Sequence, residues 1–276
     1  MEFFASAKVN LSLRVVRRRT DGFHEIDTLM APLSLGDVLE IERRPSGGLV
    51  FSCSDTTLPT GPENLVVRAV NAFAERTGIA PDVAIHLRKL IPHGAGLGGG
   101  SSDAATTLLA LNDVFETRLP KSSLAELAAT IGSDIPFFIY QSAARCRGRG
   151  ELVEPCALPE KIPLVLMKPP FGVPTPWAYK QWRDSREIPG ISYVPQSFSW
   201  GELVNDLERP VFEKHIQLAE MKRWLLAQPE VAGAMMSGSG STMLAVLRKR
   251  ELGGLLMENA RVQFGANIWL CAADTL

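Results

Sequence analysis

The sequence has few of the features that mark metalloproteins, disulfide-stabilised proteins or membrane proteins. Its four cysteines are scattered and form no CxxC pair, which argues against a zinc site or a redox dithiol. No apolar run approaches the roughly 18 residues of a membrane-spanning helix. The first ten residues, MEFFASAKVN, lack the basic-then-apolar order of a signal peptide. We therefore expect reduced thiols, a cytoplasmic location and no membrane partner.

The sequence also lacks an excess of either charge. The 29 Lys and Arg residues balance 30 Asp and Glu residues, for a net charge of −1, so there is no global basic field to attract nucleic acid. Two local basic clusters, 17–19 and 145–149, are interpreted as solvated turns, with an anion-binding edge as the alternative. A hydrophobic fraction of 46% over 276 residues excludes disordered and fibrous classes and allows one large domain or two lobes.

The order of elements along the chain predicts an α+β protein. The alternation of apolar and polar residues over 5–13 is typical of a strand that carries Lys8 and Asn10 on one face. Further strands are expected at 38–42, 49–54, 83–90, 163–167, 243–248 and 268–272, and helices at 63–78, 102–115, 122–131 and 213–228. The order of elements changes after Pro155, which predicts two α+β lobes, 1–155 and 156–276.

Two shorter segments are expected to lie outside regular structure. The segment 133–138 contains Pro136, which is expected to interrupt the helical pattern. The segment 169–179 is rich in proline and is expected to form a loop.

The most informative stretch is a loop with five glycines and two serines in eleven residues, 92–102. Gly94, Gly96 and Gly99 satisfy the pattern GxGxxG, which by itself is a weak sign of dinucleotide binding. A dinucleotide-binding fold would carry this loop near its start, and its next strand would end in an acidic residue about 20 positions later. Here the loop follows some 90 residues, and no such acid-tipped strand comes after it. No lysine follows the glycines as in a Walker A loop, and the HRD and DFG strings of protein kinases are absent.

The physical properties of this loop still favour a site for a polyphosphate. Glycines let the backbone approach an anion closely, and the helix expected to begin near Ser101 directs its positive end to the same point. The alternative is a flexible loop in which Ser101 or Ser102 only caps that helix. The residues expected to hold the phosphates are Pro92, His93, Gly94, Ala95, Gly96, Leu97, Gly98, Gly99, Gly100, Ser101 and Ser102. A second glycine loop, within 235–246, could be a plain hairpin turn.

Three motifs together resemble those of the GHMP kinase superfamily, which is named for galactokinase, homoserine kinase, mevalonate kinase and phosphomevalonate kinase. Lys8 and Asn10 stand in the first motif, PHGAGLGGGSSDAA at 92–105 matches the ATP loop, and GAMMSGSGST at 233–242 matches the third. The resemblance implies a two-lobed fold with the active site in the cleft between the lobes, ATP bound along the glycine loop, and transfer of its γ-phosphoryl group to an alcohol.

Further strings narrow this resemblance to one branch of the superfamily. DGFHEIDTLM at 21–30, IGSDIPFF at 131–138 and NDLE at 205–208 are similar to strings of its members that act on 4-diphosphocytidyl-2-C-methyl-D-erythritol. The resemblance implies ATP-dependent phosphorylation of the 2-hydroxyl of that small molecule, which has a cytidine diphosphate moiety, in the non-mevalonate isoprenoid pathway. The alternatives are a mevalonate- or homoserine-type kinase, a non-catalytic GHMP-fold ligand-binding protein, or a NAD-dependent oxidoreductase built on GxGxxG.

The resemblance also implies a catalytic pair, Lys8 and Asp134. Asp134 would accept the proton of the attacking hydroxyl, and Lys8 would keep that carboxylate ionised and steady the reacting groups. From the residues alone, a solvated strand lysine and a turn aspartate remain the alternatives. ATP implies Mg²⁺, for which Ser102 is a candidate ligand, while Asp103 would either face the metal or cap the helix.

Substrate binding is expected from a second set of residues. In the related proteins the histidine that corresponds to His24 hydrogen-bonds the cytosine ring. Phe23 and Tyr179 are the candidates to stack on that ring, with Trp177 or Phe198 as alternatives to Tyr179. The remaining expected substrate-binding residues are Asn10, Gly238 and Ser239. We expect a monomer or a weak homodimer.

Overall fold

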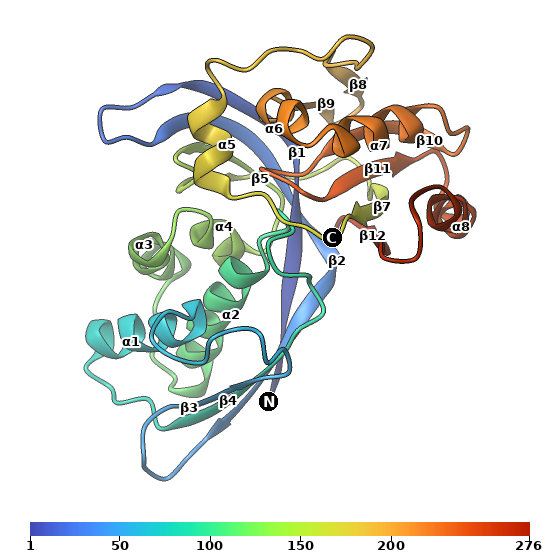
Figure 1. The fold of residues 1–276 in the computed structure, drawn as a ribbon. Coiled ribbons are helices and arrows are strands. Elements are labelled where there is room, and N and C mark those ends of the chain that lie inside the picture. The colour runs from blue at the N-terminus through green and yellow to red at the C-terminus, as the bar shows by residue number, and fades with distance from the viewer.

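Two β-sheets form the frame of the protein, and the computed structural model describes all residues, 1–276 (Figure 1). The first sheet is built on a long antiparallel pair, β1 (Glu2–Arg18) and β2 (His24–Arg43). Its strand order is β3-β4-β2-β1-β9-β8, and β5 pairs with β2 and β6. The remaining strands of this sheet are β3 (Val50–Cys53), β4 (Val83–Arg88), β5 (Ala144–Gly148), β6 (Leu152–Pro155), β8 (Gln196–Phe198) and β9 (Gly201–Asn205).

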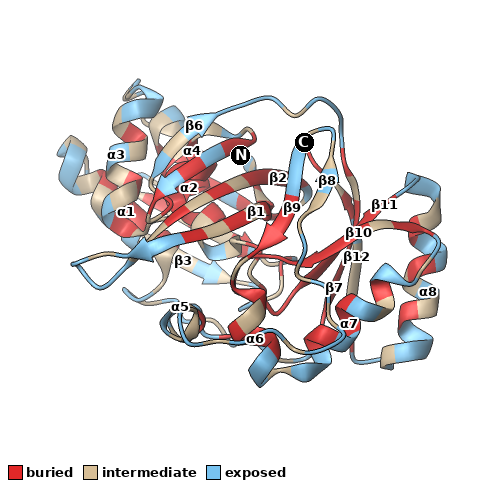
Figure 2. Ribbon diagram, turned by 90° about the horizontal axis from the view of Figure 1, so that it is seen from above, coloured by how far each residue is buried: buried red, intermediate tan, exposed pale blue.

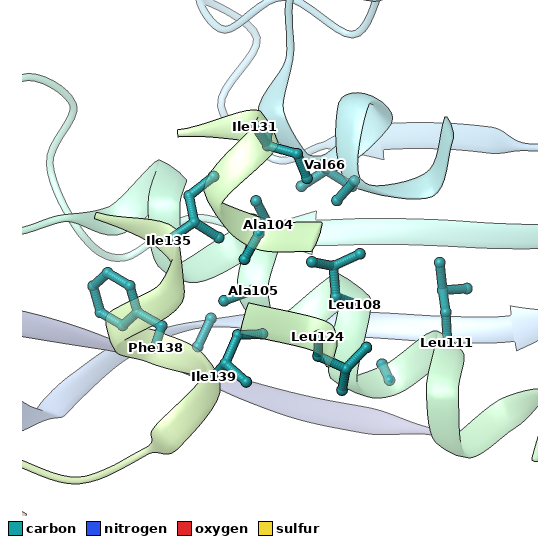
Figure 3. Close-up of a cluster of buried hydrophobic side chains, with 14 of the residues drawn as sticks. Val66, Ala104, Ala105, Leu108, Leu111, Leu124, Ile131, Ile135, Phe138 and Ile139 are labelled. Atoms are coloured by element: carbon teal, nitrogen blue, oxygen red, sulfur yellow. The ribbon is translucent and has the colours of Figure 1, made fainter. Parts of the chain in front are cut away.

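Four helices cover one face of the first sheet (Figure 1). They are α1 (Leu65–Thr77), α2 (Gly99–Val114), α3 (Lys121–Ile131) and α4 (Ile135–Tyr140). Their apolar faces and the sheet meet in a cluster of 25 buried residues, to which α2 contributes Leu108, α3 Leu124 and α4 Ile139 (Figure 3). Each fully buried side chain of this size contributes about 1.5–3 kcal/mol, so this cluster fixes the position at which α2 begins.

The second sheet comes entirely from the second half of the chain. Its order is β10-β11-β7-β12, with all neighbours antiparallel. The strands are β7 (Pro163–Lys168), β10 (Val231–Met236), β11 (Met243–Leu247) and β12 (Trp269–Asp274), and the helices of this half are α5 (Thr175–Gln181), α6 (Glu208–Lys214), α7 (Ile216–Leu226) and α8 (Gly253–Phe264). No helix of the protein combines the length and the apolar character needed to cross a membrane.

The two sheets are joined by a shared core. Val9 and Leu11 of β1 belong to one buried cluster with Leu164 and Leu166 of β7 and with Leu244 of β11. Figure 2 shows these buried strand segments in the middle of the molecule and the exposed helix faces on the outside. The strands β8 and β9 extend the first sheet although they follow residue 155 in the chain. The division into lobes 1–155 and 156–276 therefore stays a prediction.

Most of the expected elements are present, and α1 shows why they could be predicted. Asn64 Oδ1 accepts a hydrogen bond from the backbone N of Val66 at 2.9 Å, and Gly78 ends the helix in the left-handed conformation with φ 72°. Both are standard helix-end signals that a sequence reveals.

The structure corrects the sequence-based expectations at four places. The helix α3 does end at Ile131, as expected, but a new helix, α4, begins at Ile135, and Pro136 lies in its first turn, where proline is tolerated. The helix α5 occupies the end of the expected 169–179 loop. The expected 213–228 helix is two helices, because His215 has a non-helical backbone (φ −120°, ψ 71°). Finally, α2 begins at Gly99 rather than near Ser101.

Candidate active site

One large cavity, of about 1750 Å³, collects nearly all the residues singled out in the sequence. It lies at the junction of β1 and β2, the 92–102 loop, α5 and the 237–242 loop. The expected site residues that line it are Lys8, Asn10, Phe23, His24, Pro92, His93, Gly94, Ala95, Gly96, Leu97, Gly98, Gly99, Gly100, Ser101, Asp134, Tyr179, Gly238 and Ser239. Ser102 is the exception, because its side chain is buried and does not line the cavity.

Lys8 lies at the start of a chain of buried hydrogen bonds. Its Nζ donates to Asn10 Oδ1 at 2.7 Å, and Asn10 Nδ2 donates to Thr28 Oγ1 at 2.8 Å. Shifts of the β1–β2 register flank both residues, as often happens where a strand re-aims side chains at a functional site. Burial lowers the pKa of Lys8, and the charge of Asp134 opposes this shift. The ammonium group is thus held beside a carboxylate in a poorly solvated place.

Asp134 immediately precedes α4, and its carboxylate accepts no hydrogen bond from the backbone N–H groups at the start of that helix. A Cβ at Gly150, in the turn between β5 and β6, would lie 3.1 Å from Asp134 Oδ1, so the turn packs directly against this carboxylate. Burial and the nearby charge of Asp134 raise the pKa of Cys146 to about 12, so that thiol stays protonated beneath the pair. Lys8 and Asp134 therefore line the same cavity, close enough for the charge of Asp134 to act on Lys8.

The 92–102 loop needs glycine for both conformation and space. Gly94, Gly96 and Gly98 have φ of 62°, 75° and 72°, in the left-handed region that glycine adopts without strain. A Cβ at Gly96 would lie 2.6 Å from the carbonyl oxygen of Ser237, and one at Gly98 would lie 2.9 Å from Lys8 Cγ. No side chain caps α2, so the first amides of this helix are free, and its first residues, Gly99, Gly100 and Ser101, line the cavity.

Asp103 belongs to a group of buried charged side chains beside this loop. Asp103 Oδ2 accepts a hydrogen bond from Lys89 Nζ at 2.8 Å, and Lys89 also pairs with Asp37 Oδ2 at 2.5 Å. The other oxygen of Asp37 accepts from the backbone N of Leu90 at 2.6 Å and of Ile91 at 2.8 Å. Burial raises the pKa of Asp103 to about 7, against the opposing charge of Lys89. Asp103 thus joins the start of α2 to the strand that leads into the loop.

The second glycine loop is both a hairpin turn and part of the cavity wall. It joins the antiparallel strands β10 and β11, and Gly238 approaches the first motif so closely that a Cβ would lie 3.1 Å from Asn10 Oδ1. Ser239 Oγ lies 2.7 Å from Thr175 Oγ1 at the start of α5. This loop is therefore a hairpin turn, as one interpretation of the sequence predicted, and it also lies beside the first motif in the cavity.

Aromatic rings line the other end of the cavity. His24 stacks on Tyr179 with centroids 5.4 Å apart and an interplanar angle of 29°, and Trp182 meets His24 edge-on at 6.2 Å. Burial, followed by the charge of Arg18, lowers the pKa of His24, which favours the neutral ring. Neutral imidazole has one donor and one acceptor nitrogen, as the edge of a base requires.

The two alternatives to Tyr179 lie elsewhere. The ring of Trp177 packs edge-on against His215, with centroids 6.3 Å apart, and Phe198 stacks on Trp200 at 4.9 Å. Neither Trp177 nor Phe198 lines the cavity. Of the aromatic residues proposed for this role, the structure brings Phe23 and Tyr179 to the cavity.

The cavity also contains residues that sequence reasoning missed. Thr175 and Trp182 line it, as do Leu58 and Asn64 on the side of α1. None of them belongs to a recognisable motif, and Trp182 comes from the segment after α5, where spacing carries no signal. The one available signal is the presence of tryptophan and threonine beside a proline-rich segment, which is compatible with a ligand-binding surface.

Comparisons with known proteins agree with this geometry. Residues 64–142 match the family model described as GHMP kinases N terminal domain. The chain is 40% identical over 272 residues to the 4-diphosphocytidyl-2-C-methyl-D-erythritol kinase of Methylacidiphilum infernorum, covering 97% of this chain and 94% of that protein.

Solved structures give the same result. The crystal structure of a 4-(cytidine 5'-diphospho)-2C-methyl-D-erythritol kinase is similar over 100% of both chains, with a TM-score of 0.83 and 38% identity. A homoserine kinase from Cytophaga hutchinsonii shares the fold with a TM-score of 0.68, at 18% identity and over 100% of this chain and 94% of the other.

Proposed function

We propose a reaction for this chain, which belongs to the 4-diphosphocytidyl-2-C-methyl-D-erythritol kinase family of the GHMP kinases. It transfers the γ-phosphoryl group of ATP to the 2-hydroxyl of 4-diphosphocytidyl-2-C-methyl-D-erythritol. Lys8 and Asp134 are the catalytic residues. The protein is a small-molecule kinase of the non-mevalonate isoprenoid pathway. The observation that carries the catalytic assignment is the buried Lys8 beside Asp134, at the place where the glycine loop and the aromatic end of one cavity meet.

Asp134 acts as the general base in this proposal. Phosphoryl transfer needs alignment of donor and acceptor and neutralisation of charge more than covalent chemistry. A tertiary hydroxyl is a weak nucleophile, so a carboxylate that accepts its proton as the oxygen attacks helps the reaction. Lys8 Nζ, fixed by Asn10, stabilises the carboxylate and the negative charge that builds up on the transferred group.

The glycine loop and the start of α2 hold the phosphates of ATP. Their backbone amides approach an anion without a Cβ in the way, and the positive end of the helix is directed at it. The protein has no group of three or more His, Cys, Asp or Glu side chains that could hold a metal ion. Mg²⁺ would therefore be bound mainly by the phosphates, whose charge it would offset, and the protein oxygen available to it is Asp103 Oδ1, a buried oxygen without a partner in a residue that lines the cavity.

The aromatic end of the cavity binds the cytosine ring in this proposal. Phe23 and Tyr179 supply stacking faces, and neutral His24 reads the edge of the base. A mevalonate- or homoserine-type substrate carries no base to occupy such a site. The cytoplasmic location and the monomeric or weakly dimeric state stay predictions.

The test is ADP release from ATP and Mg²⁺ with three acceptors: 4-diphosphocytidyl-2-C-methyl-D-erythritol, mevalonate and homoserine. We expect turnover with the first acceptor alone. Turnover with mevalonate or homoserine would assign the protein to another GHMP activity. Tight NAD binding without any turnover would contradict the kinase assignment.

A further inference from the structure

The basic cluster 145–149 does not act as one anion-binding edge, because only one of its arginines faces the cavity. Arg145 forms a two-point ion pair with Asp27, at 2.8 and 2.6 Å. Arg147 reaches Glu154 at 3.4 Å on the outer side of the same strand pair. Arg149 lines the cavity and is partly buried, with 32% of its side chain exposed. Its role is separate from that of its neighbours.

Arg149 lies over the ring of Phe23. Its Cζ is 4.9 Å from the ring centroid, within the range of a cation–π contact. The backbone N of Arg149 donates to Glu151 Oε2 at 2.5 Å, and its Nε lies 3.6 Å from Glu151 Oε1. Gly148 and Gly150 flank it with φ of 73° and 115°, so the chain turns tightly at this point. The guanidinium group is therefore held in place by its own turn.

Phe23 has little else to hold its ring. The side chain is 52% exposed and belongs to none of the three buried hydrophobic clusters. Its backbone is fixed, because the N–H donates to Asp21 Oδ1 at 3.1 Å and the carbonyl oxygen accepts from Arg19 N at 2.8 Å. An exposed aromatic side chain loses rotamer freedom when a ligand orders it, and this cost reduces affinity. A contact that orders the ring beforehand removes part of the cost.

We propose that Arg149 is a positioning residue that holds the Phe23 ring ready to stack on the cytosine of the substrate. The proposal rests on the proposed function, since it assumes a cytidyl substrate. The planar guanidinium covers one face of the ring and leaves the other face to the base. Arg149 then acts on affinity for the cytidyl substrate and leaves ATP binding and the chemical step unchanged.

The first experiment compares Arg149→Met with Arg149→Lys and the wild type in steady-state kinetics. Methionine keeps the length of the side chain and loses the charge, and we expect KM for the cytidyl substrate to rise about 3- to 5-fold, the size of one such contact. Lysine, which keeps a cation, is expected to give a smaller rise. The value of kcat and KM for ATP are expected to stay within about 2-fold of wild type. Arg147→Met, in the same strand pair, is the matched control and should change none of these values.

The second experiment separates a contact with Phe23 from a contact with the diphosphate. Cytidine and cytidine diphosphate are measured as competitive inhibitors, and Arg149→Met should weaken both by the same factor. In a Phe23→Leu background, Arg149→Met should add no further loss. A loss confined to cytidine diphosphate, or an equal loss in the Phe23→Leu background, would overturn the proposal. Wild-type turnover in the same assay distinguishes this result from failure of the proposed function.

Discussion

At the scale of single residues, the proposed mechanism depends on two charged side chains that the fold brings together, Lys8 and Asp134. Lys8 is 4% exposed and the charge of Asp134 acts on it, yet the two are 126 positions apart in the sequence. We expect Lys8→Ala and Asp134→Ala each to lower kcat at least about 100-fold, since each removes a group that acts in the transition state.

Circular dichroism and thermal unfolding should show that both variants remain folded. Asp134→Asn is the sharper variant for the base, because it keeps the shape of the side chain and removes its capacity to accept a proton. Near wild-type turnover in a folded Asp134→Asn protein would refute the assignment of the base.

His24 is expected to make both the stability of the protein and its KM for the cytidyl substrate depend on pH in the acid range. Burial, and then Arg18, lowers its pKa from the usual value near 6.5. A depressed pKa means that His24 binds a proton less readily in the folded protein than in the unfolded chain. The contribution of His24 to the free energy of unfolding is therefore constant above about pH 6.5 and falls as the pH drops below it. We expect KM for the cytidyl substrate to be constant above that pH and to rise below it, as the ring becomes charged.

The measurement is KM against pH between about 5 and 8 for the wild type and His24→Gln. The variant should have a higher KM and no rise on the acid side. A rise in KM that begins above about pH 6.5, or one that persists in His24→Gln, would show that another group titrates.

At the scale of elements, the NDLE string at 205–208 holds the second glycine loop. Asn205 Nδ2 donates to the carbonyl oxygens of Met236 and Gly238, each at 2.7 Å, and Asn205 Oδ1 accepts from Leu207 N at 2.9 Å. Glu208 Oε1 accepts from Met236 N at 2.9 Å, and its other oxygen pairs with Lys222 at 2.6 Å. The string thus fastens the end of β10 to α6 and α7.

We expect Asn205→Ala to lower the free energy of unfolding by about 1–3 kcal/mol, because buried carbonyl oxygens lose their donors. Turnover should fall as well, since Gly238 then moves relative to Asn10. Urea unfolding and steady-state kinetics measure the two effects. Glu202→Ala, which removes the exposed ion pair with Arg14, should change stability by less than about 1 kcal/mol. Equal stability of the two variants would contradict this role for Asn205.

At the scale of the whole molecule, the cavity is walled by both halves of the chain. Ligands that bind only the folded protein stabilise it, by about 2.7 kcal/mol at 100 times Kd. ADP with Mg²⁺ and the cytidyl substrate should therefore each raise the melting temperature, by about 5–10 °C at such concentrations. Differential scanning fluorimetry checks this, with NAD as the control that should give no shift. A shift with NAD and none with ADP would contradict the assignment of the glycine loop.

Local signals explain which parts of this protein could be predicted from the sequence. The Asn64 and Gly78 ends of α1 and the alternation in β1 act over a few residues, so they could be read directly. The helix that contains Pro136 could not be predicted, because a proline in the first turn of a helix and a proline that breaks a helix differ only in where the helix begins, which the sequence does not show at this place. The break at His215 had no local mark at all.

The sequence by itself determined the family and with it the class of reaction: the glycine loop, Lys8, His24 and Asp134 stand in motifs that resemble those of the GHMP kinases. The tertiary structure decided which groups meet there. It paired Asp103 with Lys89, brought Tyr179 but neither Trp177 nor Phe198 to the cavity, and placed Arg149 on Phe23. Arg149 and Phe23, and Tyr179 and His24, are far apart in the chain and meet only through tertiary packing, so no local pattern could reveal these contacts.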